Sequence, residues 1–172
     1  RYTAMISFQY AAALKPDPDG GFVVTFRDLP EAITQGDTLE QGLAEAEDAL
    51  DEAIANRIKI NAEIPAPTPP RPGEHVIFVP ASTATKAAFY NSIRRLKMSK
   101  GELAATLGVD EREVRRLLDP YHPSKLNRIE ELMRLLGTRI VVHLQYDRSS
   151  VLEGTVADLS KDILTGDELC NA

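Results

Sequence analysis

The chain has 172 residues, which is room for one domain of ordinary size or for two small ones, and 43% of them are hydrophobic, enough to form a core. Its single cysteine, Cys170, excludes an intramolecular disulfide, and no apolar run approaches the roughly 20 residues that a membrane span requires. The net charge of −6 is unevenly distributed, with −7 over residues 1–80, +5 over residues 81–148 and −4 over residues 149–172.

The charge distribution, the spacing of the histidines and the lack of a secretory signal limit the kinds of partner, site and location that we expect. The acidic first part suits a basic protein partner, whereas the basic middle part suits a polyanion. His75, His122 and His143 lie far apart without zinc-ligand spacing, so we expect neither a metal nor a cofactor. No secretory signal is visible, and we expect a cytoplasmic protein. Because the chain begins at Arg1 rather than at methionine, we expect that a start residue or a short leader has been removed.

The first predicted element is a β-hairpin. Apolar and polar residues alternate over residues 2–10 and again over residues 22–27, the period of two that marks half-buried strands. Between them, residues 17–21 read Asp-Pro-Asp-Gly-Gly, which combines the fixed φ of proline with the positive φ that glycine adopts in tight turns. We therefore predict two antiparallel strands joined by this turn.

A short third strand, a helix and a fourth strand follow. Pro30 ends the second strand because proline cannot donate to a ladder, and residues 32–35 form a short third strand. Thr38 and Gln41 make a capping box at the start of an amphipathic helix whose polar faces are acidic. Residues 76–79 are apolar and predict a buried strand.

A proline-rich segment, residues 64–73, separates this helix from the last strand and holds five of the eleven prolines. Polyproline II geometry makes such a segment extended and semi-rigid. We expect a spacer, with a proline-motif ligand for another protein as the alternative.

Residues 2–60 resemble the N-terminal domain of HicB antitoxins, the inhibitory halves of HicA/HicB toxin-antitoxin pairs. The resemblance rests on the order and spacing of residues 19–22, 28–30 and 32–38, before a helix rich in Leu, Ala and Glu. It implies a partial ribonuclease H-like sheet-and-helix domain that covers the catalytic face of a small basic HicA-type toxin, an mRNA-cleaving ribonuclease with a double-stranded-RNA-binding-like fold.

The candidate toxin contacts lie on the hairpin turn and after the second strand: Asp17, Asp19, Phe22, Arg27, Asp28, Leu29 and Glu31. Turn chemistry and core packing explain the same residues without a partner, and for Phe22 and Leu29 this explanation is at least as good. An active nuclease would need carboxylates that converge from the sheet on two cations. Residues 1–16 contain no Asp or Glu, so we expect no catalytic site.

Four helices are predicted in the basic part of the chain. The first covers residues 86–96, and a capping box of Ser99 and Glu102 opens the second, which continues through Leu107. Asp110 and Glu113 form a third capping box before a helix that ends near residue 119, and a fourth helix covers residues 125–136.

Residues 102–118 resemble the helix-turn-helix of phage-repressor-like regulators. Gly108 suits the positive φ of the turn, and Ala105 is expected where the two helices approach each other closely. The inward positions are Val109, Val114 and Leu117. Outward side chains near the start of a docked recognition helix reach base edges, and an arginine can pair bidentately with guanine.

The candidate DNA contacts are Lys100, Glu111, Arg112, Arg115, Arg116 and Lys125, with the two lysines placed for phosphates. The alternative is that the arginines only make a small helical domain soluble. Glu111 and Glu113 count against a close approach of this helix to DNA, because their carboxylates repel phosphates.

Residues 139–146 predict an isolated strand, which must find a partner. The same strand of a second subunit would serve, through Ile140, Val141, Val142, His143 and Leu144, and would place two recognition helices on a palindromic operator. HicB proteins with such a C-terminal domain likewise form dimers. Residues 149–172 are an acidic extension, in which residues 156–164 favour a short helix or a loose tail.

The sequence therefore predicts an α+β protein with three parts: a HicB-like sheet-and-helix domain over residues 1–80, an all-α helix-turn-helix domain with a dimerising strand over residues 81–148, and the extension. We expect an antitoxin without enzymatic activity that inhibits a HicA-type toxin and represses its own operon. Its partners would be the toxin, operator DNA and its own copies, as a homodimer or higher even oligomer, with no membrane. The alternative is a stand-alone DNA-binding regulator whose N-terminal domain senses a ligand or another protein.

Overall fold

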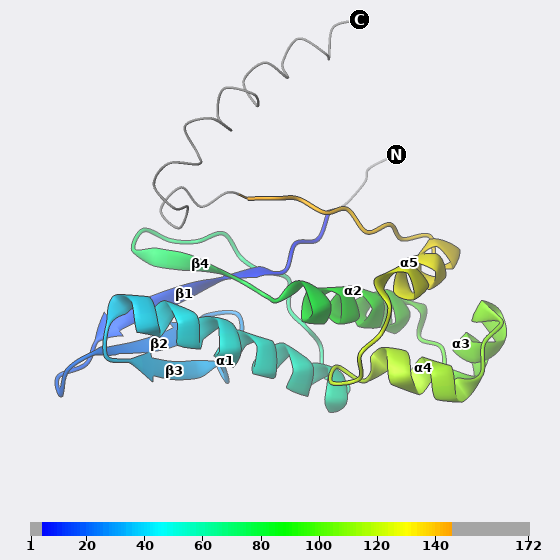
Figure 1. The fold of residues 1–172 in the computed structure, drawn as a ribbon, viewed down its shortest axis with the longest axis horizontal. Helices are drawn as coiled ribbons and strands as arrows, with labels where there is room; N and C mark the ends of the chain where they lie inside the picture. The colour runs from blue at the N-terminus through cyan, green and yellow to red at the C-terminus, as the bar shows by residue number, and fades with distance from the viewer. Residues whose placement is uncertain (1–4, 146–172) are drawn as a thin grey trace, which may run out of the picture. The chain divides into compact units, whose positions relative to one another are not determined.

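The computed structural model describes residues 5–145, and the extension over residues 149–172 lies outside this range. The fold is α+β, as predicted: a four-stranded antiparallel sheet with one long helix comes first, and shorter helices follow (Figure 1). The chain divides into one unit that ends at Ile140 and a second that begins at Val141. The strands are β1 (Gln9–Pro16), β2 (Phe22–Phe26), β3 (Ile33–Gly36) and β4 (Glu74–Phe78), and the helices are α1 (Leu39–Lys59), α2 (Ala81–Leu96), α3 (Lys100–Leu107), α4 (Glu111–Leu118) and α5 (Leu126–Leu135).

The sheet has the strand order β3-β2-β1-β4, and every neighbouring pair is antiparallel. The predicted hairpin between β1 and β2 is confirmed. Its turn is closed by hydrogen bonds from the Asp17 N–H to the Gly21 carbonyl and from the Gly20 N–H to the Asp17 carbonyl, both 3.0 Å long. Gly20 and Gly21 have φ values of 105° and 77°, which glycine adopts without steric cost.

The first strand lies later in the chain than the alternation over residues 2–10 predicted, so that placement was wrong. β1 begins at Gln9, which pairs with Phe78 at the end of β4, and it continues to Pro16. The Phe8 carbonyl still accepts the Val79 N–H at 3.0 Å, but residues 5–8 do not form part of the strand. Tyr10 and Ala12 are buried in the core of the sheet, and the small side chain of Ala11 is also buried on this inner strand.

α1 covers one face of the sheet and forms the first hydrophobic core with it. The large side chains of this core include Tyr10, Phe26, Leu29, Leu50, Ile54, Ile58, Ile64, Ile77 and Tyr90. A Cβ on Gly36 would lie 2.4 Å from the Gly42 nitrogen, so glycine at position 36 lets β3 and the start of α1 pack directly. Thr38 Oγ1 accepts the Gln41 N–H as predicted, but the Gln41 side chain accepts the Asp37 N–H instead of that of Thr38.

α2 begins at Ala81, earlier than the predicted residue 86, because the sequence after Pro80 contains no helix breaker and the Ala84 N–H already donates to the Pro80 carbonyl. The helix contributes to both hydrophobic cores. Tyr90 belongs to the sheet core, whereas Phe89 and Ile93 belong to a second core among the helices. The two parts of the chain thus share a helix, and a domain boundary at residue 80 remains a prediction.

α3 and α4 are joined by a short turn in which Gly108 has a φ of 67°. The capping box at Ser99 and Glu102 is complete. At the start of α4, Asp110 accepts the Glu113 N–H at 2.7 Å, but the Glu113 carboxylate pairs with Arg128 of α5 rather than returning to the cap. Val114 and Leu117 are buried as predicted.

One prediction about this helix pair was wrong. Ala105 was expected at the close approach of the two helices, but it is exposed, and Ala104 is the buried alanine of α3. The choice depends on which side of α3 faces the second core, and adjacent alanines carry no local signal for it.

The strand predicted over residues 139–146 is absent from residues 139–145, and Tyr146 lies outside the described range. A strand needs the backbone of a neighbour, and no strand within residues 5–145 pairs with this segment. Ile140 packs against the second core, whereas Val141, Val142 and Leu144 are 65%, 72% and 77% exposed.

None of the helices within residues 5–145 has the length and apolar character needed to cross a membrane.

Candidate functional site

The hairpin turn places two of the predicted toxin-binding carboxylates at the surface. Asp19 is exposed, while Asp17 is half-buried and its Oδ1 accepts the Asp19 N–H at 2.9 Å. Phe22 is half-buried and pairs with Pro16 in the ladder. Asp19 is therefore available to a partner, whereas Asp17 also stabilises the turn.

Arg27 lies directly after β2 and is engaged within the domain. Its Nε donates to Glu74 Oε1 at 2.7 Å and its Nη2 donates to Glu74 Oε2 at 2.8 Å. The same guanidinium donates to Thr68 Oγ1 and to the Pro69 carbonyl. The Arg27 guanidinium, helped by the Arg71 backbone N–H, lowers the pKa of Glu74 to about 2.

Asp28 completes the attachment of the proline-rich segment to the sheet. Its carboxylate accepts both the backbone N–H and the hydroxyl of Thr68, at 2.8 Å and 2.9 Å. Tyr10 donates from its hydroxyl to the Pro65 carbonyl at 2.8 Å, and burial, followed by the Asp28 charge, raises the pKa of Tyr10 to about 12. The segment is therefore fastened along its length by side chains of the domain, and it is more than a spacer between two elements.

Glu31 and Leu29 also have structural roles. Glu31 forms a two-pronged ion pair with Arg57 of α1, and this guanidinium lowers the pKa of Glu31. Leu29 is completely buried in the sheet core. Of the predicted toxin contacts, Arg27, Asp28, Leu29 and Glu31 thus hold the domain together.

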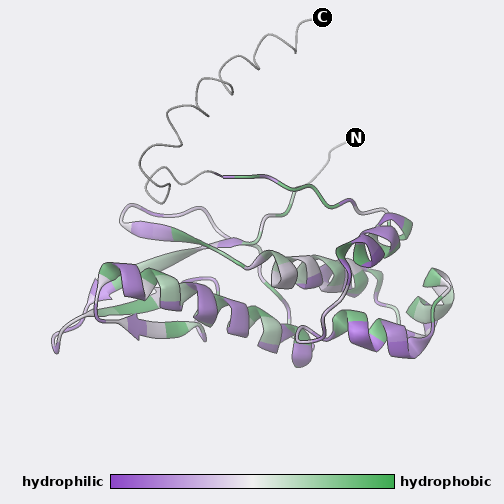
Figure 2. Cartoon of the chain, viewed as in Figure 1, coloured by the Kyte–Doolittle hydropathy of each residue, from purple (hydrophilic) through white to green (hydrophobic). Residues whose placement is uncertain are grey.

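The exposed carboxylates of α1 form a larger acidic surface than the hairpin does. They are Glu40, Glu45, Glu47, Asp48 and Glu52, and none of them takes part in an ion pair within residues 5–145. The amphipathic pattern marked these residues as solvent-facing. Figure 2 shows the hydrophilic residues along α1.

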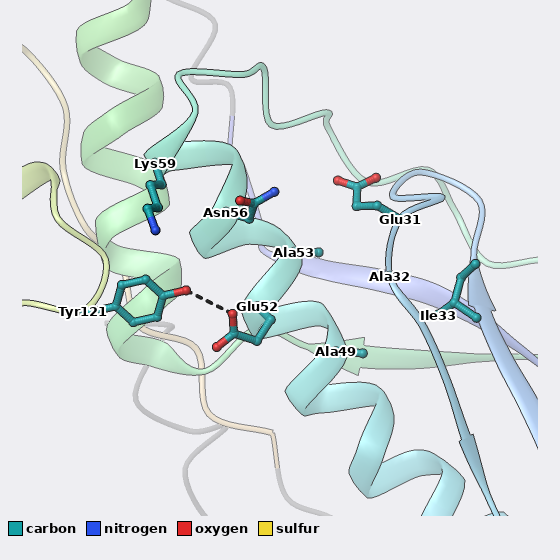
Figure 3. Close-up of a pocket in the computed structure, with 9 residues that line it drawn as sticks. All are labelled: Glu31, Ala32, Ile33, Ala49, Glu52, Ala53, Asn56, Lys59 and Tyr121. Atoms are coloured by element: carbon teal, nitrogen blue, oxygen red, sulfur yellow. Dashed lines mark hydrogen bonds between the residues drawn. The ribbon is translucent and has the colours of Figure 1, made fainter.

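A shallow depression of about 490 Å³ lies between α1, the start of β3 and the loop after α4. Figure 3 shows its lining, in which Tyr121 points toward α1 and donates to Glu52 Oε2 at 3.0 Å. This hydrogen bond raises the pKa of Tyr121. Ile33 lies at the opposite rim and is 62% exposed. The depression is open and offers a mixed polar and apolar surface.

The helix pair presents the basic residues that the sequence marked. Arg112, Arg115 and Arg116 of α4 are all exposed, and so are Lys100 at the start of α3 and Lys125 just before α5. Arg115 pairs with Glu111 one turn earlier at 3.0 Å, whereas Arg112 and Arg116 have no ion pair within residues 5–145. Their guanidinium groups are therefore available for acceptors on another molecule, of which phosphates and guanine edges are the best matched in geometry.

The segment predicted to dimerise has apolar side chains in water. Val141, Val142, His143 and Leu144 are exposed, and only Ile140 is partly covered.

Within residues 5–145 no group of three or more His, Cys, Asp or Glu side chains is arranged to hold a metal ion.

One charged residue that sequence reasoning missed is Lys86 of α2, which is 5% exposed. Its ammonium donates to the Arg116 carbonyl and to Ser124 Oγ. A signal for its burial was present, because Lys86 lies three, four and seven residues before Phe89, Tyr90 and Ile93, on the apolar stripe of the helix.

Comparison with known proteins gives a consistent result. The family described as HicB-like antitoxin of bacterial toxin-antitoxin systems matches residues 9–88. Antitoxin HicB of Escherichia coli (strain K12) is 34% identical over 132 residues, which cover 77% of this chain and 96% of that protein. Antitoxin HicB 2 of Photorhabdus laumondii is 38% identical over 70% of this chain and 85% of its own length. Antitoxin HicB of Pseudomonas fluorescens is 33% identical over 81% of this chain and 96% of its own length.

Proposed function

Because this chain belongs to the HicB antitoxin family, we propose that it inhibits a small HicA-type mRNA-cleaving ribonuclease and represses its own operon by binding operator DNA through α3 and α4. In this proposal the sheet domain is the inhibitor, the helix pair is the DNA reader, and the chain has no catalytic site of its own.

Electrostatics support the toxin-binding part of the proposal. Residues 1–80 carry a net charge of −7, and Asp19 and five carboxylates of α1 are exposed. A basic ribonuclease would be attracted to this surface, since complementary charge accelerates encounter. Because Arg27, Asp28 and Glu31 are engaged within the domain, α1 and the hairpin turn are the better candidates for contact.

The observation that carries the DNA-binding part is the arrangement of α3, Gly108 and α4. Two short helices meet at a turn with a left-handed glycine, and α4 exposes three arginines in an eight-residue helix. This arrangement supports α4 as a recognition helix for the major groove, where arginines would contact guanine and lysines at neighbouring helix starts would contact phosphate.

Dimerisation would complete the DNA reader. The exposed apolar run from Val141 to Leu144 lies directly after the helical domain and lacks a strand partner within residues 5–145. Pairing with the same run of a second copy would satisfy its backbone and give two recognition helices a two-fold relationship.

The deciding experiment first asks whether a short reading frame for a basic protein lies next to that of this chain, and then co-expresses the two proteins. Association and loss of RNA cleavage by that protein support the antitoxin role, while a neighbour that cleaves equally well in complex contradicts it. Metal-dependent RNA cleavage by the purified chain alone would contradict the absence of a catalytic site. Binding of a duplex from the chain's own promoter, with affinity that falls steeply in salt, tests the repressor role.

A stand-alone transcription regulator is the second candidate. In such a protein, the depression lined by Ile33, Glu52 and Tyr121 would be the surface that senses a ligand or another protein. It lies where the sheet domain meets the loop after α4. Promoter binding without any association with the neighbouring protein would favour this candidate.

A further inference from the structure

Lys86 is a buried cation at the junction of three helices. It lies in α2, is 5% exposed, and has no carboxylate partner in an ion pair within residues 5–145. Its Nζ donates to the Arg116 carbonyl at 3.0 Å and to Ser124 Oγ at 2.7 Å. Burial lowers the pKa of Lys86, and the nearby Asp119 opposes this effect. A buried ammonium is costly, so its two acceptors matter to the structure.

The Arg116 carbonyl needs an outside donor for a reason visible in the sequence. In a continuous helix this carbonyl would accept the N–H of residue 120, but residue 120 is proline and has no N–H. From the backbone of residues 5–145 it accepts only a 3.3 Å bond, which the Asp119 N–H donates. Lys86 supplies the missing donor, and its positive charge lies at the C-terminal end of α4, where the helix dipole favours a cation.

The other end of α4 is held differently. Asp110 caps its first turn, and Glu113 pairs with Arg128 of α5 at 2.6 Å. Because α4 has eight residues and is therefore only about 12 Å long, a small tilt at its C-terminal end moves the exposed arginines on its outer face. Lys86 connects that end to α2, which packs on both cores.

We propose that Lys86 is a positioning residue for operator binding, which holds the C-terminal end of α4 and the entry to α5 so that Arg112, Arg115 and Arg116 meet DNA in one orientation. Lys86 itself is buried and contacts no DNA. The inference rests on the proposed DNA-binding function of α4.

The test compares Lys86→Met with the wild-type chain in three measurements: affinity for a duplex of the chain's own promoter, affinity for the toxin identified by co-expression, and thermal unfolding. Methionine keeps roughly the volume of the side chain and removes the buried charge and both hydrogen bonds, which leaves the Arg116 carbonyl and Ser124 Oγ without this donor. We expect promoter affinity to fall roughly tenfold, because two charge-assisted hydrogen bonds that orient α4 are lost. The unfolding temperature should fall because the two acceptors lose their donor, whereas the toxin affinity of the folded protein should stay at the wild-type value.

A matched control is Lys59→Met, which removes the same charge from an exposed position on α1. It should leave promoter affinity unchanged. The salt dependence separates positioning from direct contact, since each lost phosphate contact lowers the slope of log affinity against log salt concentration by about one. Lys86→Met should keep the wild-type slope.

Ser124→Ala provides a second variant that removes one acceptor of Lys86 and leaves the lysine in place. Ser124→Ala should weaken promoter binding, as Lys86→Met does. If Lys86→Met does not fold, the promoter affinity of Ser124→Ala tests the proposal. Promoter affinities of both variants equal to wild type overturn the proposal. A loss of toxin affinity as large as the loss of promoter affinity also overturns it, because it assigns Lys86 a role in folding alone. If the wild-type chain binds no promoter duplex, the proposed repressor function itself fails.

Discussion

Arg27 and Glu74 are joined by two parallel hydrogen bonds, 2.7 Å and 2.8 Å long, across 47 residues of sequence. The pair connects the end of β2 to the start of β4, and the same guanidinium holds Thr68 and Pro69 of the proline-rich segment. Arg27, which the sequence marked as a contact for a partner, thus holds three segments of the domain together. We call the Arg27–Glu74 ion pair the clamp.

The clamp makes stability depend on pH in a defined direction. Arg27 lowers the pKa of Glu74 from 4.5 to about 2, so the stabilisation is fully present above about pH 4.5 and is lost as the pH falls toward 2. We expect Glu74→Gln to have a lower free energy of unfolding than wild type at neutral pH. This difference should disappear as the pH falls toward 2. Urea unfolding followed by circular dichroism at a series of pH values measures this. Glu47→Gln, on the exposed face of α1, is the control and should show no gap.

Leu29 is predicted to act through the core alone. It is completely buried against α1, so Leu29→Ala leaves a cavity and should lower the free energy of unfolding by about 2–5 kcal/mol. Chemical denaturation measures this loss, and the folded fraction should bind toxin with wild-type affinity. Unchanged stability together with weaker toxin binding would instead make Leu29 a contact residue.

Gly36 should tolerate no side chain. Its Cβ would lie 2.4 Å from the Gly42 nitrogen, which is backbone and cannot yield, so Gly36→Ala should cost about 1–3 kcal/mol of stability. Gly101→Ala is the matched control, because its Cβ would meet only the end of the Glu111 side chain at 3.0 Å. That change should be neutral or should stabilise α3 by up to about 1 kcal/mol. Thermal unfolding of both variants compares the two sites.

Glu111 should weaken operator binding in the wild-type chain. It pairs with Arg115 at 3.0 Å and repels phosphates. Glu111→Gln should therefore raise promoter affinity roughly two- to fivefold at low salt, the range expected for one exposed charge. Fluorescence anisotropy with a labelled promoter duplex measures the change, with Glu40→Gln on α1 as the control. A lower affinity would show that Glu111 accepts a hydrogen bond from a base.

Val142 should be central to assembly. It is 72% exposed in the single chain, and a lysine at this position would place a charge in the proposed strand pair. We expect Val142→Lys to sediment as a monomer at concentrations where the wild-type chain is a dimer. Ile60→Lys, at another exposed apolar position, should sediment like wild type. A dimer that persists in Val142→Lys would place the subunit interface elsewhere.

The sequence by itself determined the features that depend on neighbouring residues. The hairpin turn at Gly20 and Gly21, the cap at Ser99 and the left-handed turn at Gly108 were all readable, because a turn or cap is decided within four or five residues. The amphipathic stripe of α1 likewise predicted most of its buried residues, since one face of a helix repeats every 3.6 residues. Leu39 at the start of the stripe is nevertheless 44% exposed, and Leu43 is only partly buried.

Only the tertiary structure decided which charged side chains are free and which are engaged. Arg27 finds Glu74 47 residues away, Glu31 finds Arg57 at a separation of 26, and Lys86 reaches the Arg116 carbonyl at a separation of 30. It also decided where β1 begins, because the strand starts where β4 supplies a partner. A hydrogen bond requires two groups in one place, and local sequence specifies each group but not the fold that brings them together.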